Sequence, residues 1–238
     1  MRLEYQEYQP RKIVNVHKHV DGPWFWVKYS AHPYIGCRSG CEFCYLRGER
    51  YLRNRAPDTF DTLIQIKTNA TDLLSKELQR LQPDVIACGD WQQPAEDRYR
   101  LSRQMLKQVH EAGFPLFIVE RSPLLTRDLD LLSEINRHSW VGIAISISNL
   151  DPGLKQAFEP RSPGVKRRLE MMAEIAAAGI LVGTALMPIL PIVGDHETLL
   201  DETVRATADH GGKFVLGDRK STRLNSSHSS VSRMPSSA

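Results

Sequence analysis

The chain has 238 residues, of which 41% are hydrophobic and 25% are charged, and its formal net charge is +3. The apolar fraction is sufficient for a packed core, which excludes a generally disordered chain, and the length fits one α/β barrel or two smaller domains. No run of about 18 apolar residues and no apolar N-terminal signal are present, so we expect a cytoplasmic protein that does not span a membrane.

The net positive charge of the chain comes from a Ser-rich C-terminal segment. Residues 219–238 contain four Lys or Arg residues, eight serines and no acidic residue, so residues 1–218 carry a net charge of −1. The overall charge therefore gives no evidence for a nucleic-acid partner. We expect this tail to be disordered and non-native, because it resembles translated sequencing-adapter or vector sequence, which implies that the protein is truncated after Asp218. A natural disordered tail is the alternative.

The secondary structure is predicted from hydrophobic periodicity, beginning at the N-terminus. Residues 1–23 form a polar extension with a strand at 13–16. Its two histidines, His17 and His19, are either metal ligands or ordinary surface residues. Strands are then predicted at 24–30, 63–68, 84–88, 115–120, 141–148, 180–187 and 214–216. Helices are predicted at 71–81 with Thr71 as N-cap, and at 95–112, 126–136, 162–178 and 195–210.

Apolar strands that alternate with amphipathic helices indicate right-handed βαβ units and a parallel sheet. Apart from the extra strand at 63–68, six strands precede the tail, whereas a closed barrel has eight strands in about 250 residues. The sequence therefore predicts an α/β fold over residues 24–218, a partial (β/α)6 TIM-like barrel with outer helices and a truncated C-terminus. A doubly wound open sheet is the alternative. In both folds, ligands bind at the carboxyl ends of the strands.

Three cysteines, Cys37, Cys41 and Cys44, follow the first of these strands with the spacing C-x3-C-x2-C. Gly36 and Gly40 permit the left-handed turns that a short loop needs to wrap around one centre. Soft thiolates select zinc, Cu(I) or iron–sulfur clusters. The spacing therefore predicts a metal centre in this loop.

The number of thiols favours a cluster over zinc. A structural zinc site needs four ligands, and the fourth cysteine, Cys88, lies 44 residues beyond Cys44. Three cysteines on a four-iron cluster leave one iron open for a substrate or cofactor. The alternatives are a non-enzymatic adaptor protein whose zinc site is completed by His32, and three cysteines that bind nothing.

The cysteine motif, with an aromatic residue before its last cysteine, resembles the radical S-adenosylmethionine (SAM) superfamily. Longer strings resemble its spore photoproduct lyase-like branch, also labelled DNA repair photolyase-like: HPYIGCRSGCEFCYLR, ACGDWQQPAE, RSPLLTRDLDLL, AISISNLDPGLKQAFEPRSP and GTALMPILPIVGD. The resemblance implies a [4Fe–4S] cluster on the three cysteines, and SAM as a second cofactor that chelates the open iron. It also implies an external one-electron reductant of flavodoxin or ferredoxin type. One electron then cleaves SAM to a 5′-deoxyadenosyl radical, which abstracts hydrogen from the substrate.

The resemblance also implies roles for residues at the ends of the strands. The adenine would lie near Phe43 and Met187, the methionine amino group near Gly89 and Asp90, the carboxylate at Arg121, and the ribose near Ser146 and Ser148. Glu159 and Arg161 match a recurring Glu-Pro-Arg element, which is also explained by pairing with each other or by helix capping. Cys88 is predicted to point toward the site, either as a hydrogen-atom donor or as a small buried apolar residue.

The substrate is left open by the sequence. Damaged DNA is suggested by the branch name. The cysteine loop is followed by four arginines, Arg47, Arg50, Arg53 and Arg55. They would attract a phosphate-bearing substrate, although four arginines in a loop are more often simply solvated. If the C-terminus has been lost, an inactive fragment that still binds the cluster is a further alternative.

Overall fold

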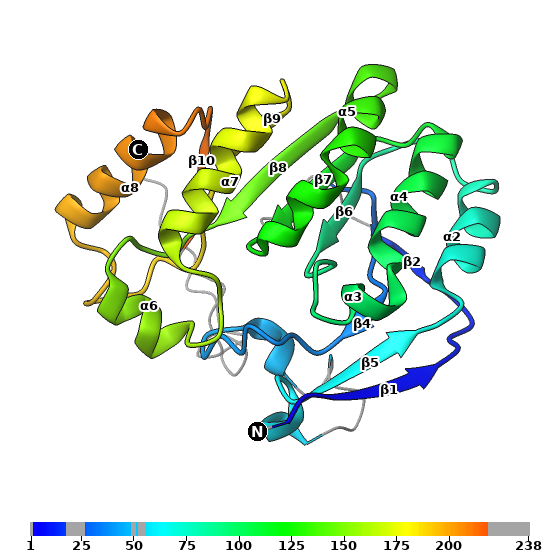
Figure 1. Cartoon of the computed structure of the whole chain (residues 1–238), viewed down its shortest axis with the longest axis horizontal. Helices are drawn as coiled ribbons and strands as arrows, with labels where there is room; N and C mark the ends of the chain where they lie inside the picture. The colour runs from blue at the N-terminus through cyan, green and yellow to red at the C-terminus, as the bar shows by residue number, and fades with distance from the viewer. Residues whose placement is uncertain (1, 18–26, 49–50, 52–55, 219–238) are drawn as a thin grey trace, which may run out of the picture.

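The computed structural model describes residues 2–17, 27–48, 51 and 56–218, so the predictions for residues 24–26, for His19 and for the tail lie outside the described residues. The larger of its two sheets has the strand order β10-β9-β8-β7-β6-β3-β2 (Figure 1). These strands are β2 (Val14–Val16), β3 (Tyr29–Ala31), β6 (Ile86–Gly89), β7 (Leu116–Glu120), β8 (Val141–Ser146), β9 (Leu181–Leu186) and β10 (Val215–Gly217).

Neighbouring strands from β3 to β10 pair in parallel, and β2 pairs antiparallel to β3. The prediction of six parallel strands in an α/β fold is therefore confirmed. Their carboxyl ends point to the same edge of the sheet, where the cysteine loop and α6 (Pro152–Phe158) lie (Figure 1). Of the strand predicted at 24–30, residues 24–26 lie outside the described residues, Val27 and Lys28 are not in a strand, and β3 begins at Tyr29. The strand predicted at 13–16 is β2.

A second, three-stranded sheet packs beside the cysteine loop. It has the order β1-β5-β4, from β1 (Glu4–Tyr8), β4 (Tyr34–Ile35) and β5 (Leu63–Lys67), and β5 is the predicted extra strand. β1 was not predicted, because its sequence EYQEY is polar and mostly exposed. Through β1 and β2, the segment predicted as an extension pairs with strands of both sheets.

The helices cover the outer face of the large sheet, where α2, α4, α5 and α7 stand side by side (Figure 1). Several details differ from the predictions, beginning with α6, which was not predicted. Thr71 is not the N-cap of the first helix, since Asn69 takes that position without a side-chain bond. The predicted helix 95–112 is two helices, because Arg100 adopts a left-handed φ of 50° between them. The remaining helices are α2 (Ala70–Leu78), α3 (Glu96–Tyr99), α4 (Leu101–Ala112), α5 (Leu129–His138), α7 (Val165–Ala177) and α8 (Glu197–Asp209).

Alternate strand residues face two separate apolar layers, as the period of two requires. On β8, Ile143 and Ile145 pack into the large cluster formed with the helices. Ala144 belongs instead to a smaller cluster with Phe117 and Ala185, whose members all lie on or next to strands of the sheet. Because residues of several strands meet there without a helix, this smaller cluster marks the inner, concave face. Side chains at positions 146 and 121 continue the inner series toward the carboxyl ends.

Within the described residues, no helix has both the length and the apolar character that a bilayer crossing requires.

Candidate functional site

The cysteine loop is shaped by backbone contacts with distant segments. Cys37 N donates to Phe60 O at 3.0 Å, and Glu42 N donates to Phe158 O at 3.0 Å. Gly36 and Gly40 have φ values of 91° and 60°, so the predicted left-handed turns are confirmed. The loop is therefore held from both sides, by the segment before β5 and by the end of α6.

Arg47 closes the loop from its C-terminal side. Its Nε donates to Cys41 O at 2.9 Å and its Nη2 to Gly40 O at 2.8 Å, while the guanidinium lies 5.0 Å from the ring centroid of Phe60. Of the predicted basic run, Arg50, Arg53 and Arg55 lie outside the described residues. Arg47 thus binds carbonyl oxygens of the cysteine loop, which could not be predicted from its position in a basic run.

Replacing Arg47 by glutamine should loosen the loop, because glutamine supplies no charged pair of donors for the two carbonyls and no cation over Phe60. Hydrogen bonds from a charged donor contribute about 1.5–3 kcal/mol. We expect the reconstituted variant to lose iron to a chelator about 10-fold faster than the wild type. Arg98→Gln is the matched control, since Arg98 covers Tyr99 at the same 5.0 Å but pairs with Glu7 on β1 rather than with carbonyls of the cysteine loop. Equal release rates for both variants would contradict this role.

The three thiols are close enough to influence one another. Cys37 and Cys41 are buried, and Cys44 is half-buried. Burial, followed by the Asp90 carboxylate and by Cys41, raises the pKa of Cys44 to about 12. Burial also raises the pKa of Cys37, with further contributions from Asp90 and Cys41. A metal centre that binds these residues as thiolates therefore has to displace their protons.

Arg121, at the carboxyl end of β7, connects the loop to the strand ends. Its Nη1 donates to Cys41 Sγ at 2.8 Å and its Nη2 to Ser146 Oγ at 3.0 Å. The same guanidinium lies 3.4 Å from the carboxylate of Glu159. The structure thus brings together Cys41, Arg121 and Ser146, although 105 residues separate Cys41 from Ser146 in the sequence.

Glu159 is buried beneath this contact. It accepts hydrogen bonds from the Ser148 hydroxyl and from Arg168 on α7, which itself is only 1% exposed. Although burial raises the pKa of Glu159, the guanidinium groups of Arg121 and Arg168 hold it below its usual range. Sequence reasoning missed Arg168, because one arginine among three cations at 166–168 carries no signal of burial.

Arg161 departs from the suggested pairing with Glu159. It forms an ion pair with Asp61, a residue that precedes β5 and lies next to Gly40. Glu159 and Arg161 therefore point to different partners, and the Glu-Pro-Arg element joins α6 to the cysteine loop on one side and to α7 on the other.

The loop after β6 faces the thiols. The carboxylate Oδ1 of Asp90 lies 3.6 Å from Cys37 Sγ, and Gln93 Nε2 donates to the same sulfur at 3.3 Å. Gly89 O lies 3.2 Å from Nδ1 of His32, the histidine of the zinc alternative. Gln93 was not among the predicted site residues, although it lies three positions beyond Asp90.

The two residues expected near the adenine lie in apolar surroundings. Phe43 packs with Cys41 and Leu190, beside the cysteine loop. Met187 lies against the inner layer with Ala185. Both positions agree with a core role, and a contact with the adenine stays a prediction.

The orientation predicted for Cys88 is wrong. Its side chain belongs to the large cluster between the sheet and the helices, and its Sγ donates to the carbonyl oxygen of Ile86 at 3.9 Å. By alternation, Ala87 and Gly89 take the inner positions of β6, and Ala87 is found in the inner layer. Cys88 therefore faces away from the strand ends and is a small core residue.

Among the described residues, no three His, Cys, Asp or Glu side chains are arranged to hold a single metal ion. The three thiols of the loop are buried or half-buried and influence one another, and such soft ligands would suit an iron–sulfur cluster.

The chain resembles proteins of known and unknown activity. It is 32% identical over 206 residues to an uncharacterized protein of Mycobacterium tuberculosis, which covers 82% of this chain and 61% of the relative. Its fold is similar to a spore photoproduct lyase variant with bound AdoMet and dinucleoside spore photoproduct, with a TM-score of 0.56, 18% identity and coverage of 82% and 56% of the two chains. It is also similar to methylornithine synthase, with a TM-score of 0.53, 16% identity and coverage of 82% and 55%.

The chain therefore spans about three fifths of the length of the curated relative and slightly more than half of the solved structures. The likeness in fold covers 82% of this chain in both structural comparisons. The family model described as the Radical SAM superfamily matches residues 32–202, from the start of that loop into α8. With its three-cysteine loop at the carboxyl edge of a parallel sheet, this chain belongs to the radical SAM superfamily.

Proposed function

We propose that Cys37, Cys41 and Cys44 hold the [4Fe–4S] cluster of this radical SAM protein and that the adjacent strand ends bind SAM. The observation that carries the proposal is the position of Arg121, whose guanidinium contacts both Cys41 Sγ and Ser146 Oγ. A cation is thereby fixed between the cluster loop and the inner edge of the sheet. When bound, the cluster and SAM supply the one-electron chemistry that abstracts a hydrogen atom from a substrate.

The residues around Arg121 match the functional groups of an amino acid. The guanidinium has five donors and binds a carboxylate in bidentate fashion, which suits the methionine carboxylate of SAM. The Asp90 carboxylate faces the thiols from the opposite loop and suits the methionine ammonium group. Ser146 Oγ, on the inner face of β8, would hold the ribose. Glu159 pairs with Arg121 and is itself held by Arg168.

The proposal is tested by anaerobic reconstitution with iron and sulfide, followed by incubation with SAM and a strong one-electron reductant. We expect a [4Fe–4S] cluster and the formation of 5′-deoxyadenosine and methionine in equal amounts, measured by chromatography. A protein that binds one zinc tightly and forms no cluster would refute the proposal. An external reductant of flavodoxin or ferredoxin type is the proposed electron source.

Replacing Arg121 by methionine should weaken SAM binding roughly 10- to 100-fold, because one charge-assisted contact to a carboxylate contributes about 1.5–3 kcal/mol. Equilibrium dialysis of SAM against the reconstituted variant measures this effect at equal iron content. Arg121→Lys keeps the charge and should recover part of the affinity. If the methionine variant binds SAM as tightly as the wild type, Arg121 does not hold the carboxylate.

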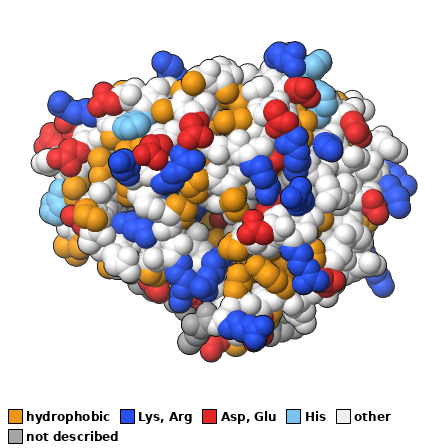
Figure 2. Space-filling view, in the orientation of Figure 1, with side chains coloured by type: hydrophobic (Ala, Val, Ile, Leu, Met, Phe, Trp, Pro, Cys, Tyr) orange, Lys and Arg blue, Asp and Glu red, His pale blue; other side chains and the backbone are white. Residues whose placement is uncertain are grey.

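Damaged DNA is the first substrate to test, because one of the proteins with a similar fold is a spore photoproduct lyase variant that holds a dinucleoside spore photoproduct. Figure 2 shows acidic and basic side chains interspersed over the face in view. This face lacks the continuous basic surface that binding along a duplex backbone would use, so a substrate of a few nucleotides is the one to test. A dinucleoside photoproduct repaired by the reconstituted protein supports this substrate class, and no turnover of any pyrimidine photoproduct would exclude it.

A further inference from the structure

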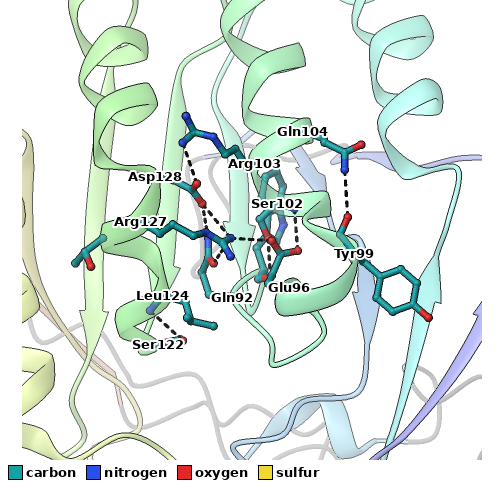
Figure 3. Close-up of polar contacts among 12 residues, drawn as sticks. Gln92, Glu96, Tyr99, Ser102, Arg103, Gln104, Ser122, Leu124, Arg127 and Asp128 are labelled. Atoms are coloured by element: carbon teal, nitrogen blue, oxygen red, sulfur yellow. Dashed lines mark hydrogen bonds and ion pairs between the residues drawn. The ribbon is translucent and has the colours of Figure 1, made fainter.

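The segment 90–96 lies between the cysteine loop and a buried polar network on the helix side of the sheet. Its Asp90 and Gln93 face the thiols, whereas Gln92 and Glu96 face the network that Figure 3 shows. Gln93 is 4% exposed. A buried amide that contacts a metal-binding sulfur is a candidate for control of the metal centre.

The hydrogen bonds of Gln93 fix the direction of its amide group. Its Oε1 accepts from the backbone N–H of Arg38 at 3.0 Å. Its Nε2 donates to Cys37 Sγ at 3.3 Å and to Asp90 O at 3.2 Å. Exchanging the oxygen and nitrogen would place donor against donor at Arg38 and acceptor against acceptor at Asp90. The N–H group therefore points at the sulfur in the only satisfied orientation of this amide.

The rest of the segment keeps Gln93 in place. Trp91 Nε1 donates to Ala31 O at 2.7 Å, and Glu96 N donates to Gln93 O at 2.9 Å. The fully buried Glu96 carboxylate accepts from Ser102 N at 2.9 Å and from Arg127 at 2.9 Å, as the dashed lines of Figure 3 show. It also accepts from the hydroxyl of Tyr34. This network anchors α3 and thus the end of the segment, so the donor at Gln93 is ordered without help from the metal centre.

We propose that Gln93 is a positioning residue that raises the reduction potential of the cluster through its hydrogen bond to Cys37. An N–H group directed at a cluster thiolate stabilises the more negative, reduced state relative to the oxidised state. This inference rests on the proposed function, since it requires that Cys37 bind the cluster. It assigns to this chain a residue that eases the entry of the electron needed for SAM cleavage.

The test compares wild type, Gln93→Met and Gln93→Glu after anaerobic reconstitution, with iron content and midpoint potential measured by redox titration followed by electron paramagnetic resonance. Methionine preserves the volume and removes the donor, so we expect a full cluster with a lower potential. Glutamate keeps the acceptor for Arg38 and places a negative charge at the sulfur, so we expect a larger shift in the same direction.

Gln92→Leu is the matched control. Gln92 is equally buried on the same segment, but its side chain donates to Asp128 and not to a thiol. We expect this variant to lose conformational stability and to keep the wild-type potential. Potentials that are unchanged in both Gln93 variants, or shifted equally in the Gln92 variant, would overturn the proposal.

The outcome also separates this inference from the proposed function. If the wild type assembles a cluster and the Gln93 variants have its potential, only the role of Gln93 fails. If the wild type assembles no cluster, both fail. If Gln93→Met is the one variant that assembles no cluster, the hydrogen bond is tested in the wild type by comparing its Fe–S stretching frequencies in H2O and D2O. Exchange of the hydrogen in an N–H···S bond shifts these frequencies, so the lack of a shift would refute the hydrogen bond.

Discussion

Alanine at Cys37, Cys41 or Cys44 is expected to abolish the iron–sulfur cluster, whereas alanine at Cys88 leaves it intact. In the proposed ligand set each loop cysteine supplies one of three protein ligands, and a cluster with two open irons would not be retained. Cys88 lies on the other face of β6, in the core beneath the helices. The measurement is iron and sulfide content together with the broad visible absorption after anaerobic reconstitution.

The Cys88→Ala variant also serves as the control for general damage from a lost thiol. It should reduce the free energy of unfolding by about 1 kcal/mol, a common value for a single substitution, and keep the wild-type iron content. The proposed ligand set is refuted by a loop variant that retains the cluster or by a Cys88 variant that loses it. Because Cys88 faces the helix layer, its alanine variant should also give the same products from SAM.

Leucine at Glu159 is expected to destabilise the protein by about 3–5 kcal/mol, the largest stability effect among the charged residues that line the site. The substitution leaves Arg168, which is 1% exposed, without a carboxylate in a region that water does not reach. It also removes the partner of Arg121. Urea unfolding, monitored by circular dichroism, measures the loss.

Glu174→Leu, on α7, is the control. It removes one of the two carboxylate partners of Arg167, the neighbour of Arg168, whose ion pairs with Glu170 and Glu174 lie at the surface. Exposed pairs contribute little because water screens them, so this variant should unfold close to the wild-type midpoint. A double variant with Arg168→Leu and Glu159→Leu should recover part of the loss, since Arg168 no longer remains as an unpaired buried charge, whereas Arg121 still lacks its carboxylate partner. Equal effects at Glu159 and Glu174 would show that burial of the pair does not matter.

The part of the fold that follows from periodicity could be predicted from the sequence. The runs at 116–120, 141–146 and 181–186 are apolar enough to be strands buried on both faces, and the helices between them show helical spacing. The cysteine loop could be predicted because its spacing is local. The branch resemblance added the polar strand ends, of which Arg121 and Ser146 are found together.

The direction of Cys88 could not be predicted from the same information. A strand that is buried on both faces shows no polar alternation, so nothing in the run that ends at Cys88 distinguishes the inner from the outer positions. The face is decided by the pairing of Cys88 with Ile118 on β7, which continues the series that packs on the helices.

Contacts between distant segments were likewise beyond sequence reasoning. Asp61 and Arg161 are 100 residues apart and meet only because α6 returns to the cysteine loop. Gln93 and Cys37 are 56 residues apart and meet because the ends of β3 and β6 are neighbours. β1 was missed for another reason, since an edge strand with exposed polar side chains has no hydrophobic period.

The inner apolar layer has a consequence for how molecules reach the reacting groups. Phe117, Ala144 and Ala185 pack against one another inside the sheet, below the level of Arg121 and Ser146. Because these side chains fill the inner face below the polar strand ends, a ligand of Arg121 and Ser146 is expected to approach from the carboxyl ends of the strands and not from their amino-terminal ends.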